Sequence, residues 1–275
     1  MLLIADSGST KTKWILQSKD QVLEYIGPGL NPYFVTDEFM SSELENVFQA
    51  LKRPKPDCIG FYGTGVTDEE KSSRIQHLLS TQFGSENITV KSDILGAGLS
   101  LLGMEKGVGC ILGTGAASAR FEHGEIIEQQ PSLGFWLGDE GSGSDLGKEL
   151  VKAYLRSDLG ELQAEFEKEF GVFDRYAVFE KLNQPRPNAW FATFTPFLKK
   201  FEQEKVIQEI LNDRFDLFVS KNLMKYRLDV SQEIGFIGSV AFHFQEMLTK
   251  VLRQYLDNEL IFEQDPLPGL LRFHS

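Results

Sequence analysis

Residues 2–14 have the sequence LLIADSGSTKTKW, in which an apolar run leads into a loop of small and polar residues. The run Leu2–Ala5 predicts a buried strand, which ends at Asp6. Two further strand-like runs follow at 13–17 and 21–26, so the segment predicts a three-stranded meander. A glycine-containing loop at the end of such a strand lets backbone N–H groups approach an anion closely.

The same plan occurs again later in the chain. Val108–Leu112 is an apolar run that ends in Gly113-Thr114-Gly115, and strand-like runs follow at 117–121 and 125–129. The agreement is one of plan and not of residue identity, and we interpret it as a structural duplication. Two lobes built in this way, if they face each other, would place their loops on opposite sides of a cleft.

The remaining segments alternate between helical and strand-like patterns. The expected elements are helices at 37–52, 68–83, 94–103 and 240–256, strands at 57–62, 88–91 and 232–237, and a mostly helical stretch at 142–226. The tail at 266–275 contains two prolines and a glycine within its first four residues, and we expect it to be irregular.

Composition and charge narrow the class of protein. The chain has 275 residues, of which 41% are hydrophobic and 25% charged, as in a globular protein large enough for two lobes. Its net charge of -12 would repel a nucleic-acid backbone. Lys199-Lys200 is the nearest approach to a basic patch, and it is typical of a solvated helix face. We therefore expect no nucleic-acid partner.

The cysteines and the apolar runs indicate the compartment. Cys58 and Cys110 lie far apart in apolar runs without CxxC or metal-ligand spacing, which is typical of buried free thiols in a reducing compartment. The N-terminal segment lacks the basic start and the apolar length of a signal peptide. No run approaches the roughly 18 apolar residues of a membrane span. We expect a cytoplasmic protein with no membrane partner.

The two loops have the chemistry of phosphate-binding sites. Backbone amides and the hydroxyls of the first loop could bind phosphate oxygens, and Asp6 is placed to hold a hydrated Mg²⁺. The loop Gly113-Thr114-Gly115-Ala116 has the same character. An ordinary hairpin turn explains either loop equally well when it is taken alone. Neither the Walker A pattern nor the dinucleotide-binding glycine pattern is present.

Three further segments each allow two interpretations. Asp93 follows a strand and starts a helix, so it could cap the helix or accept a proton from a substrate hydroxyl, and both can hold. The segment 134–142 contains Asp139 and Ser142, either of which could cap a helix, while Asp139 could also bind sugar hydroxyls. A strand at 235–237 followed by Gly238-Ser239 suits either an adenosine site or an ordinary strand-to-helix turn.

The order of these motifs resembles that of the actin/hexokinase/Hsp70 superfamily. The phosphate-1 loop corresponds to 6–12, the catalytic aspartate to Asp93, the phosphate-2 loop to 113–116 and the adenosine loop to 235–240. The segment LGDEGSGSDLG at 137–147 is similar to the GDEGS motif of N-acetylglucosamine kinases and BadF/BadG/BcrA/BcrD-type ATPases. The resemblance covers nearly the whole chain.

This resemblance implies a fold and an activity. The fold would be α/β, with two ribonuclease H-like lobes of the actin-like ATPase type and a cleft between them. The N-terminal lobe would be residues 1–106, with the tail 258–275 packing on it, and residues 107–257 would form the C-terminal lobe with a helical insert. The protein would use ATP and Mg²⁺ to phosphorylate an amino sugar, most simply N-acetylglucosamine or a relative. A BadF/BadG-type ATPase that drives a partner protein, a catalytically silent sensor and a homodimer all stay open.

The resemblance also assigns residue roles. Asp93 would be the base and a sugar ligand, and Asp6 would hold Mg²⁺ through water. The ATP contacts would be Gly8, Ser9, Thr10, Lys11, Thr12, Gly113, Thr114, Gly115, Gly238 and Ser239. The other sugar contacts would be Asn31, Ser132, Leu133, Gly134 and Asp139. Related kinases carry a Gly-Trp-Gly type segment where this chain has Ser132-Leu133-Gly134, and the nearby Trp136 is out of register.

Overall fold

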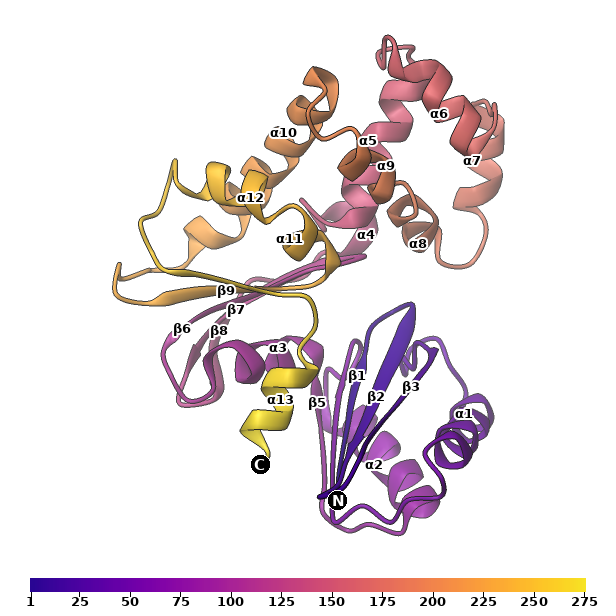
Figure 1. Ribbon diagram of the computed structural model, residues 1–275, viewed down its shortest axis with the longest axis vertical. Coiled ribbons are helices and arrows are strands. Elements are labelled where there is room, and N and C mark those ends of the chain that lie inside the picture. Colours follow the sequence, from indigo (N-terminus) through magenta and orange to yellow (C-terminus); the bar gives the residue numbers. More distant parts are fainter. The chain divides into compact units, whose positions relative to one another are not determined.

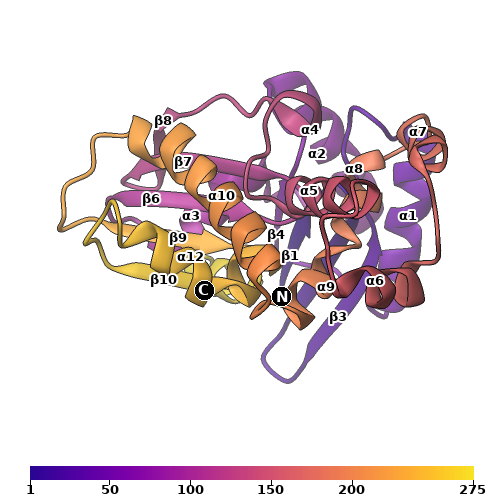
Figure 2. The same ribbon diagram turned by 90° about the horizontal axis from the view of Figure 1, so that it is seen from above.

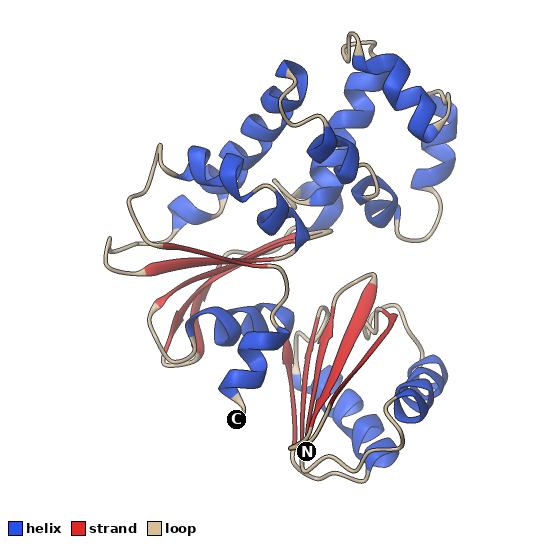
Figure 3. Ribbon diagram, in the orientation of Figure 1, coloured by secondary structure: helices blue, strands red, loops and turns tan.

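The computed structural model describes residues 1–275, which divide into two compact units. Unit 1 consists of Met1–Gly109, Phe121–Ile127 and Asp265–Ser275, and unit 2 consists of Cys110–Arg120 and Glu128–Gln264. Figure 3 shows two five-stranded sheets with helices around them, as expected for an α/β fold.

The first sheet contains the predicted meander. Its strand order is β3-β2-β1-β4-β5, with β1, β2 and β3 antiparallel and with β4 and β5 parallel to β1 (Figure 1). The strands are β1 Leu2–Ser7, β2 Lys11–Gln17, β3 Val22–Pro28, β4 Cys58–Gly63 and β5 Ile88–Ser92. Because β1 and β4 are parallel neighbours, the loops that follow them lie at the same edge of the sheet.

Side-chain alternation along β1 separates two hydrophobic cores. Leu3 and Ala5 belong to the core that also contains residues of α1 Asp37–Ala50 and α2 Glu69–Phe83. Ile4 belongs to the other core, together with residues of α3 Asp93–Leu102 and α13 Leu267–Phe273. Neighbouring side chains of a strand point to opposite faces, so this alternation covers each face of the sheet with one pair of helices.

The expectation of an irregular tail is wrong. The chain forms a strand, β10 Leu260–Glu263, and then the helix α13, whose Leu267 and Leu270 are buried. Prolines lie at positions 266 and 268, before and within the first turn, where the backbone N–H groups have no partner within the helix anyway. These prolines made the segment resemble a loop in the sequence although they are compatible with a helix start.

The second sheet repeats the plan of the first. Its strand order β10-β9-β6-β7-β8 is the order β5-β4-β1-β2-β3 with each strand replaced by its counterpart. The strands are β6 Gly107–Leu112, β7 Ala116–Glu122, β8 Glu125–Gln129, β9 Glu233–Ile237 and β10. The duplication inferred from the sequence is therefore present in the strand order, and β10 is the one strand that the sequence did not indicate.

The helices of unit 2 occupy most of the stretch expected to be helical. They are α4 Gly134–Leu137, α5 Gly143–Leu155, α6 Leu162–Phe170, α7 Arg175–Leu182, α8 Pro187–Ala192, α9 Thr195–Lys200, α10 Lys205–Lys221, η1 Leu223–Lys225, α11 Ser239–His243 and α12 Gln245–Leu252. Figures 1 and 2 show α10 and α12 on the same face of the sheet. The single helix expected at 240–256 is two helices, because the backbone leaves helical geometry at Phe244. None of the helices of the chain is long and apolar enough to cross a membrane.

Candidate functional site

The loop after β1 is held rigid by its own hydrogen bonds. The Gly8 N–H donates to the Lys11 carbonyl oxygen at 3.0 Å, and the Ser7 and Thr12 hydroxyls lie 2.8 Å apart. Thr12 is buried and its hydroxyl donates to the Pro28 carbonyl oxygen at 2.8 Å, so this side chain already has internal partners. Thr10 and Lys11 are exposed, and Gly8 and Ser9 are partly exposed, so they can reach a ligand.

Asp93 lies at the start of α3 and is held by two donors. The Thr64 hydroxyl hydrogen-bonds to one of its carboxylate oxygens, and the Ile94 N–H donates to the other at 2.9 Å. Burial raises the pKa of Asp93, and these two hydrogen bonds oppose the rise. The interpretation of Asp93 as the helix cap is wrong, because Ser92 is the N-cap and its hydroxyl accepts the Leu95 N–H.

Asp6 shares this region with other carboxylates. Its pKa is raised from 3.8 to about 7, chiefly by burial and next by repulsion from Asp93 and Asp265. Lys13, which pairs with Asp265 at 2.7 Å, lowers it again in part. Burial therefore favours a proton at Asp6, and the negative charge of its neighbours favours either a proton or a cation there.

Asn31 reaches the same edge of the sheet. It is buried, its side-chain oxygen accepts the Tyr33 N–H at 3.0 Å, and it packs against Gly65, where a β-carbon would lie 2.3 Å from that oxygen. The Thr64 N–H in turn donates to the Ser7 carbonyl oxygen at 2.8 Å. Unit 1 thus gathers Asp6, Asn31 and Asp93, three residues predicted from the sequence.

Thr64 is a site residue that sequence reasoning missed. It belongs to Gly63-Thr64-Gly65, which has the same residues as Gly113-Thr114-Gly115 and also follows an apolar strand. The identity of these two three-residue segments is the signal from which a role for Thr64 could have been predicted.

The titration of Asp6 gives a prediction for stability. A carboxyl group with a folded-state pKa of about 7 keeps its proton at pH values where the unfolded chain, with a pKa of 3.8, has lost it. Its stabilising contribution is therefore complete below pH 3.8 and is lost as the pH rises through 7. We expect Asp6→Asn to raise the thermal midpoint by about 3 °C or more at pH 8 without Mg²⁺ or nucleotide, and by less at pH 5. Thermal unfolding of both proteins across this range tests it, and equal midpoints at pH 8 would contradict the raised pKa of Asp6.

Unit 2 brings its own predicted loops together. The carboxylate of Asp139 accepts the Ala116 N–H at 3.3 Å, which joins the GDEG segment to the loop after β6. The Gly143 N–H donates to the Gly113 carbonyl oxygen at 2.7 Å, and the Ser144 N–H donates to the Thr114 carbonyl oxygen at 3.1 Å. Burial raises the pKa of Asp139, while the Ala116 N–H lowers it.

The loop after β9 meets the same place in unit 2. A β-carbon on Gly238 would lie 2.4 Å from the Leu112 carbonyl oxygen and 3.1 Å from the Gly113 nitrogen. Only a residue without a side chain fits so close to the neighbouring strand, and Ser239 then begins α11 in an exposed position. Three of the segments predicted from the sequence therefore converge in unit 2.

The segment before the GDEG motif is exposed. Ser132 and Leu133 are exposed, and Gly134 begins the short helix α4. Trp136 is 67% exposed and its ring lies 4.7 Å from that of Phe135. The structure leaves the predicted roles of these residues in sugar binding untested.

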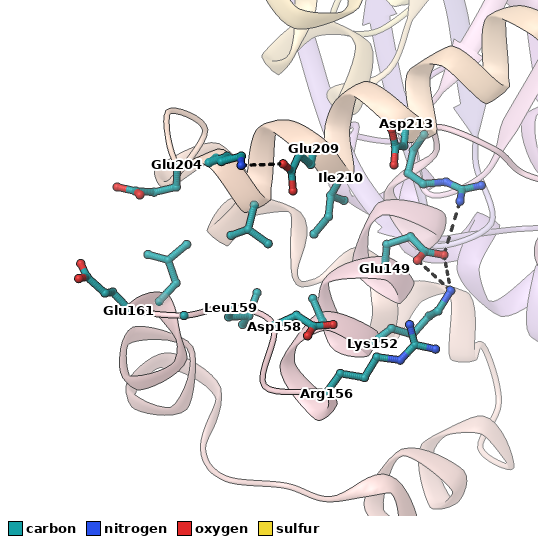
Figure 4. Close-up of a pocket in the computed structure, with 16 residues that line it drawn as sticks. Glu149, Lys152, Arg156, Asp158, Leu159, Glu161, Glu204, Glu209, Ile210 and Asp213 are labelled. Atoms are coloured by element: carbon teal, nitrogen blue, oxygen red, sulfur yellow. Dashed lines mark hydrogen bonds and ion pairs between the residues drawn. The ribbon is translucent and has the colours of Figure 1, made fainter.

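An open groove of about 610 Å³ lies in unit 2 between α5, α6 and α10 (Figure 4). Its charged side chains pair with one another, as Glu149 does with Lys152 at 2.8 Å and Lys205 with Glu209 at 3.6 Å. None of the residues predicted to bind ATP or sugar lines this groove.

No protein-family model and no curated protein matches the chain, whereas solved structures do. Among solved structures, a candidate N-acetylglucosamine kinase from Porphyromonas gingivalis is 32% identical with a TM-score of 0.94, over 100% of this chain and 98% of that one. A candidate N-acetylglucosamine kinase from Chromobacterium violaceum is 18% identical with a TM-score of 0.73, over 100% of this chain and 98% of that one.

A third structure is more distant. It is a ROK family glucokinase from Streptomyces griseus in complex with glucose and AMPPNP, and it is 11% identical with a TM-score of 0.58, over 98% of this chain and 97% of that one. The two more distant structures share the fold alone, whereas the identity and coverage of the Porphyromonas gingivalis protein show the family. The chain therefore belongs to the N-acetylglucosamine kinase family, which has the actin-like ATPase fold.

Proposed function

We propose that this protein is an ATP-dependent kinase that transfers the γ-phosphoryl group to a hydroxyl of an amino sugar, N-acetylglucosamine or a close relative. The observation that carries the proposal is the grouping of Asp6, Asn31 and Asp93 at one edge of the first sheet, with Asp93 oriented by Thr64. A kinase needs a polar group beside the acceptor hydroxyl and a charged group beside the phosphates, and these residues supply both. The family of the chain supports the same class of substrate.

Asp93 would act on the acceptor hydroxyl. Its raised pKa makes the carboxylate a better proton acceptor than an exposed aspartate. Thr64 and Ile94 donate hydrogen bonds that fix the orientation of the Asp93 carboxylate. Its remaining lone pairs stay free to accept the proton of the sugar hydroxyl. Asn31 and Asp139 would bind other sugar hydroxyls, because amide and carboxylate oxygens accept the hydrogen bonds that hydroxyls donate.

Backbone amides would hold the phosphates. In unit 1 the partly exposed Gly8 and Ser9 and the exposed Thr10 form the loop after β1, and in unit 2 the loop 113–115 is partly exposed as well. Such amides stabilise negative charge without moving when charge develops on the transferring group. Gly238 and Ser239 would contact the adenosine.

The residues present fit a hydrated Mg²⁺ rather than one held by protein alone. No group of three or more His, Cys, Asp or Glu side chains is arranged to bind a metal ion. Mg²⁺ commonly keeps several waters and takes one or two carboxylates together with substrate phosphates. Asp6 would hold it, since the negative charge of the neighbouring carboxylates Asp93 and Asp265 favours a cation there. When bound, Mg²⁺ would neutralise charge on the nucleotide phosphates.

ADP release measured with a panel of sugars tests the function. We expect turnover that depends on sugar, with N-acetylglucosamine or N-acetylmannosamine preferred over glucose, and a phosphorylated sugar detectable by mass spectrometry. Turnover that does not respond to any sugar would instead favour an ATPase that drives a partner protein. An absence of ATP binding in calorimetry would contradict both the kinase and the ATPase, and it would favour a catalytically silent sensor.

A further inference from the structure

Asp145 is a buried carboxylate that the proposed mechanism does not use. It lies in the first turn of α5 and is only 4% exposed. Its carboxylate accepts the Gly141 N–H at 3.0 Å and pairs with the Arg214 guanidinium of α10 at 2.9 Å. Lys148 lies 3.8 Å away on the same helix. The ion pair between Asp145 and Arg214 thus joins the start of α5 to a helix that follows much later in the chain.

The turn that Asp145 holds is the turn that contains Asp139. The backbone of Asp139 has a φ of 59°, a left-handed conformation that is costly for a residue other than glycine. The Ser142 N–H donates to the Asp139 carbonyl oxygen at 3.0 Å, and Gly141 has a φ of 73°. A conformation of this kind persists only where surrounding contacts impose it. The hydrogen bond from Gly141 to Asp145 is one of those contacts.

The same turn also holds the loop after β6. Gly143 and Ser144 donate to the carbonyl oxygens of Gly113 and Thr114, and Ala116 donates to the Asp139 carboxylate. A shift of the turn would therefore move both the predicted sugar carboxylate and the predicted phosphate loop. The Arg214 guanidinium pairs with Asp145 and Glu149, so the effect of this side chain on the turn would pass through Asp145.

Stability alone is a poor explanation of this ion pair. A buried ion pair often contributes little compared with apolar residues of similar size, because its charges lose their hydration. An apolar side chain at position 145 could fill the space but could not accept the Gly141 N–H. The ion pair instead fixes the orientation of the Asp145 carboxylate, which accepts the Gly141 N–H of the strained turn.

We propose that Asp145 and Arg214 are positioning residues for sugar binding, which set the place of Asp139 and of the 113–116 loop. This inference rests on the proposed kinase function. Arg214 matters here because its planar guanidinium donates along a fixed direction. Glu149 pairs with the Arg214 guanidinium at 3.6 Å and so helps to fix its orientation.

Steady-state kinetics of Arg214→Met compared with Leu211→Ala test the proposal. Leu211 is buried on the same helix and is apolar, so its truncation destabilises the helix packing without removing a hydrogen bond or ion pair to the turn. We expect Arg214→Met to raise the KM for sugar about tenfold or more with a smaller change in kcat. Leu211→Ala should keep a KM for sugar within about twofold of that of the original protein, when both variants are assayed well below their unfolding temperatures.

Two further variants keep the proposal testable if Arg214→Met does not fold. Arg214→Lys keeps the charge and loses the planar fork, and Asp145→Asn keeps an oxygen for Gly141 and loses the charge. Each should raise the KM for sugar, by less than Arg214→Met. A KM equal to that of the original protein in both variants, or an equal rise in Leu211→Ala and Arg214→Met, would overturn the positioning role.

Amide hydrogen exchange separates this inference from the proposed function. In the variants at Arg214, peptides covering residues 113–116 and 139–144 should exchange faster than in the original protein and in Leu211→Ala. This readout needs no substrate, so it tests the positioning role even if no sugar stimulates turnover. Unchanged exchange in these two segments would overturn the inference while leaving the kinase function standing.

Discussion

Asp93→Asn is expected to lower turnover by about 100-fold or more while sugar binding stays measurable, as for the loss of a general base. Asparagine has the shape of aspartate: its one side-chain oxygen can accept the Ile94 N–H, and its amide NH2 can donate to the Thr64 hydroxyl, which then acts as the acceptor. The start of α3 should therefore stay in place, because Ser92 supplies the cap. What the variant loses is the ability to accept the proton of the sugar hydroxyl.

Single-turnover kinetics measure the rate of phosphate transfer by Asp93→Asn, and calorimetric titration measures its affinity for sugar. A turnover within about twofold of the original protein would remove Asp93 from the mechanism, since even modest base catalysis contributes more than this. Thr64→Val is the matched control at the same carboxylate. It removes the hydrogen bond that lowers the pKa of Asp93, so that pKa should rise further and the acidic limb of the pH–rate profile should move to higher pH.

The plan of the fold could be predicted from the sequence because short, continuous segments of the chain determine it. Each lobe begins with an apolar strand, a small-residue loop and a hairpin, and the two sheets have equivalent strand orders. The strand β10 and the helix α13 were not accessible in this way. Their segments are short, and the prolines at 266 and 268 have the same local signature in a loop and in the first turn of a helix.

The candidate site was predictable only in part, for a related reason. Asp6, Asn31 and Asp93 lie in motifs that can be recognised one at a time. The partnership of Thr64 with Asp93, and that of Arg214 with Asp145, exist only after folding brings distant segments together. The misassigned cap has a local cause. Ser92 and Asp93 are both good caps, and the helix begins at Asp93, one residue before the expected start, because the Ser92 hydroxyl accepts the Leu95 N–H.

Gly269→Ala is expected to destabilise the protein by about 3 kcal/mol or more, at the upper end of what overpacking costs. The helix α13 approaches α3 so closely that a β-carbon on Gly269 would lie 2.3 Å from the Ser100 carbonyl oxygen and 2.1 Å from its hydroxyl oxygen. The hydroxyl could rotate away, but the carbonyl belongs to the backbone of α3. Relief therefore requires the two helices to separate, and the higher helix propensity of alanine, worth up to about 1 kcal/mol, is too small to compensate.

Chemical denaturation of Gly269→Ala and of Arg272→Ala measures this cost. Arg272 is exposed on the same helix, so its truncation should change stability by less than about 0.5 kcal/mol. The separation of α13 from α3 would also expose Leu267 and Leu270, which share a core with Ile4 of β1 and Leu99 of α3. Because Asp6 lies in the strand that contains Ile4 and Asp93 begins α3, the variant should lose activity together with stability. A Gly269→Ala protein as stable as Arg272→Ala would mean that α13 does not pack against α3 at this distance, and that the C-terminal segment does not support the carboxylates at the candidate site.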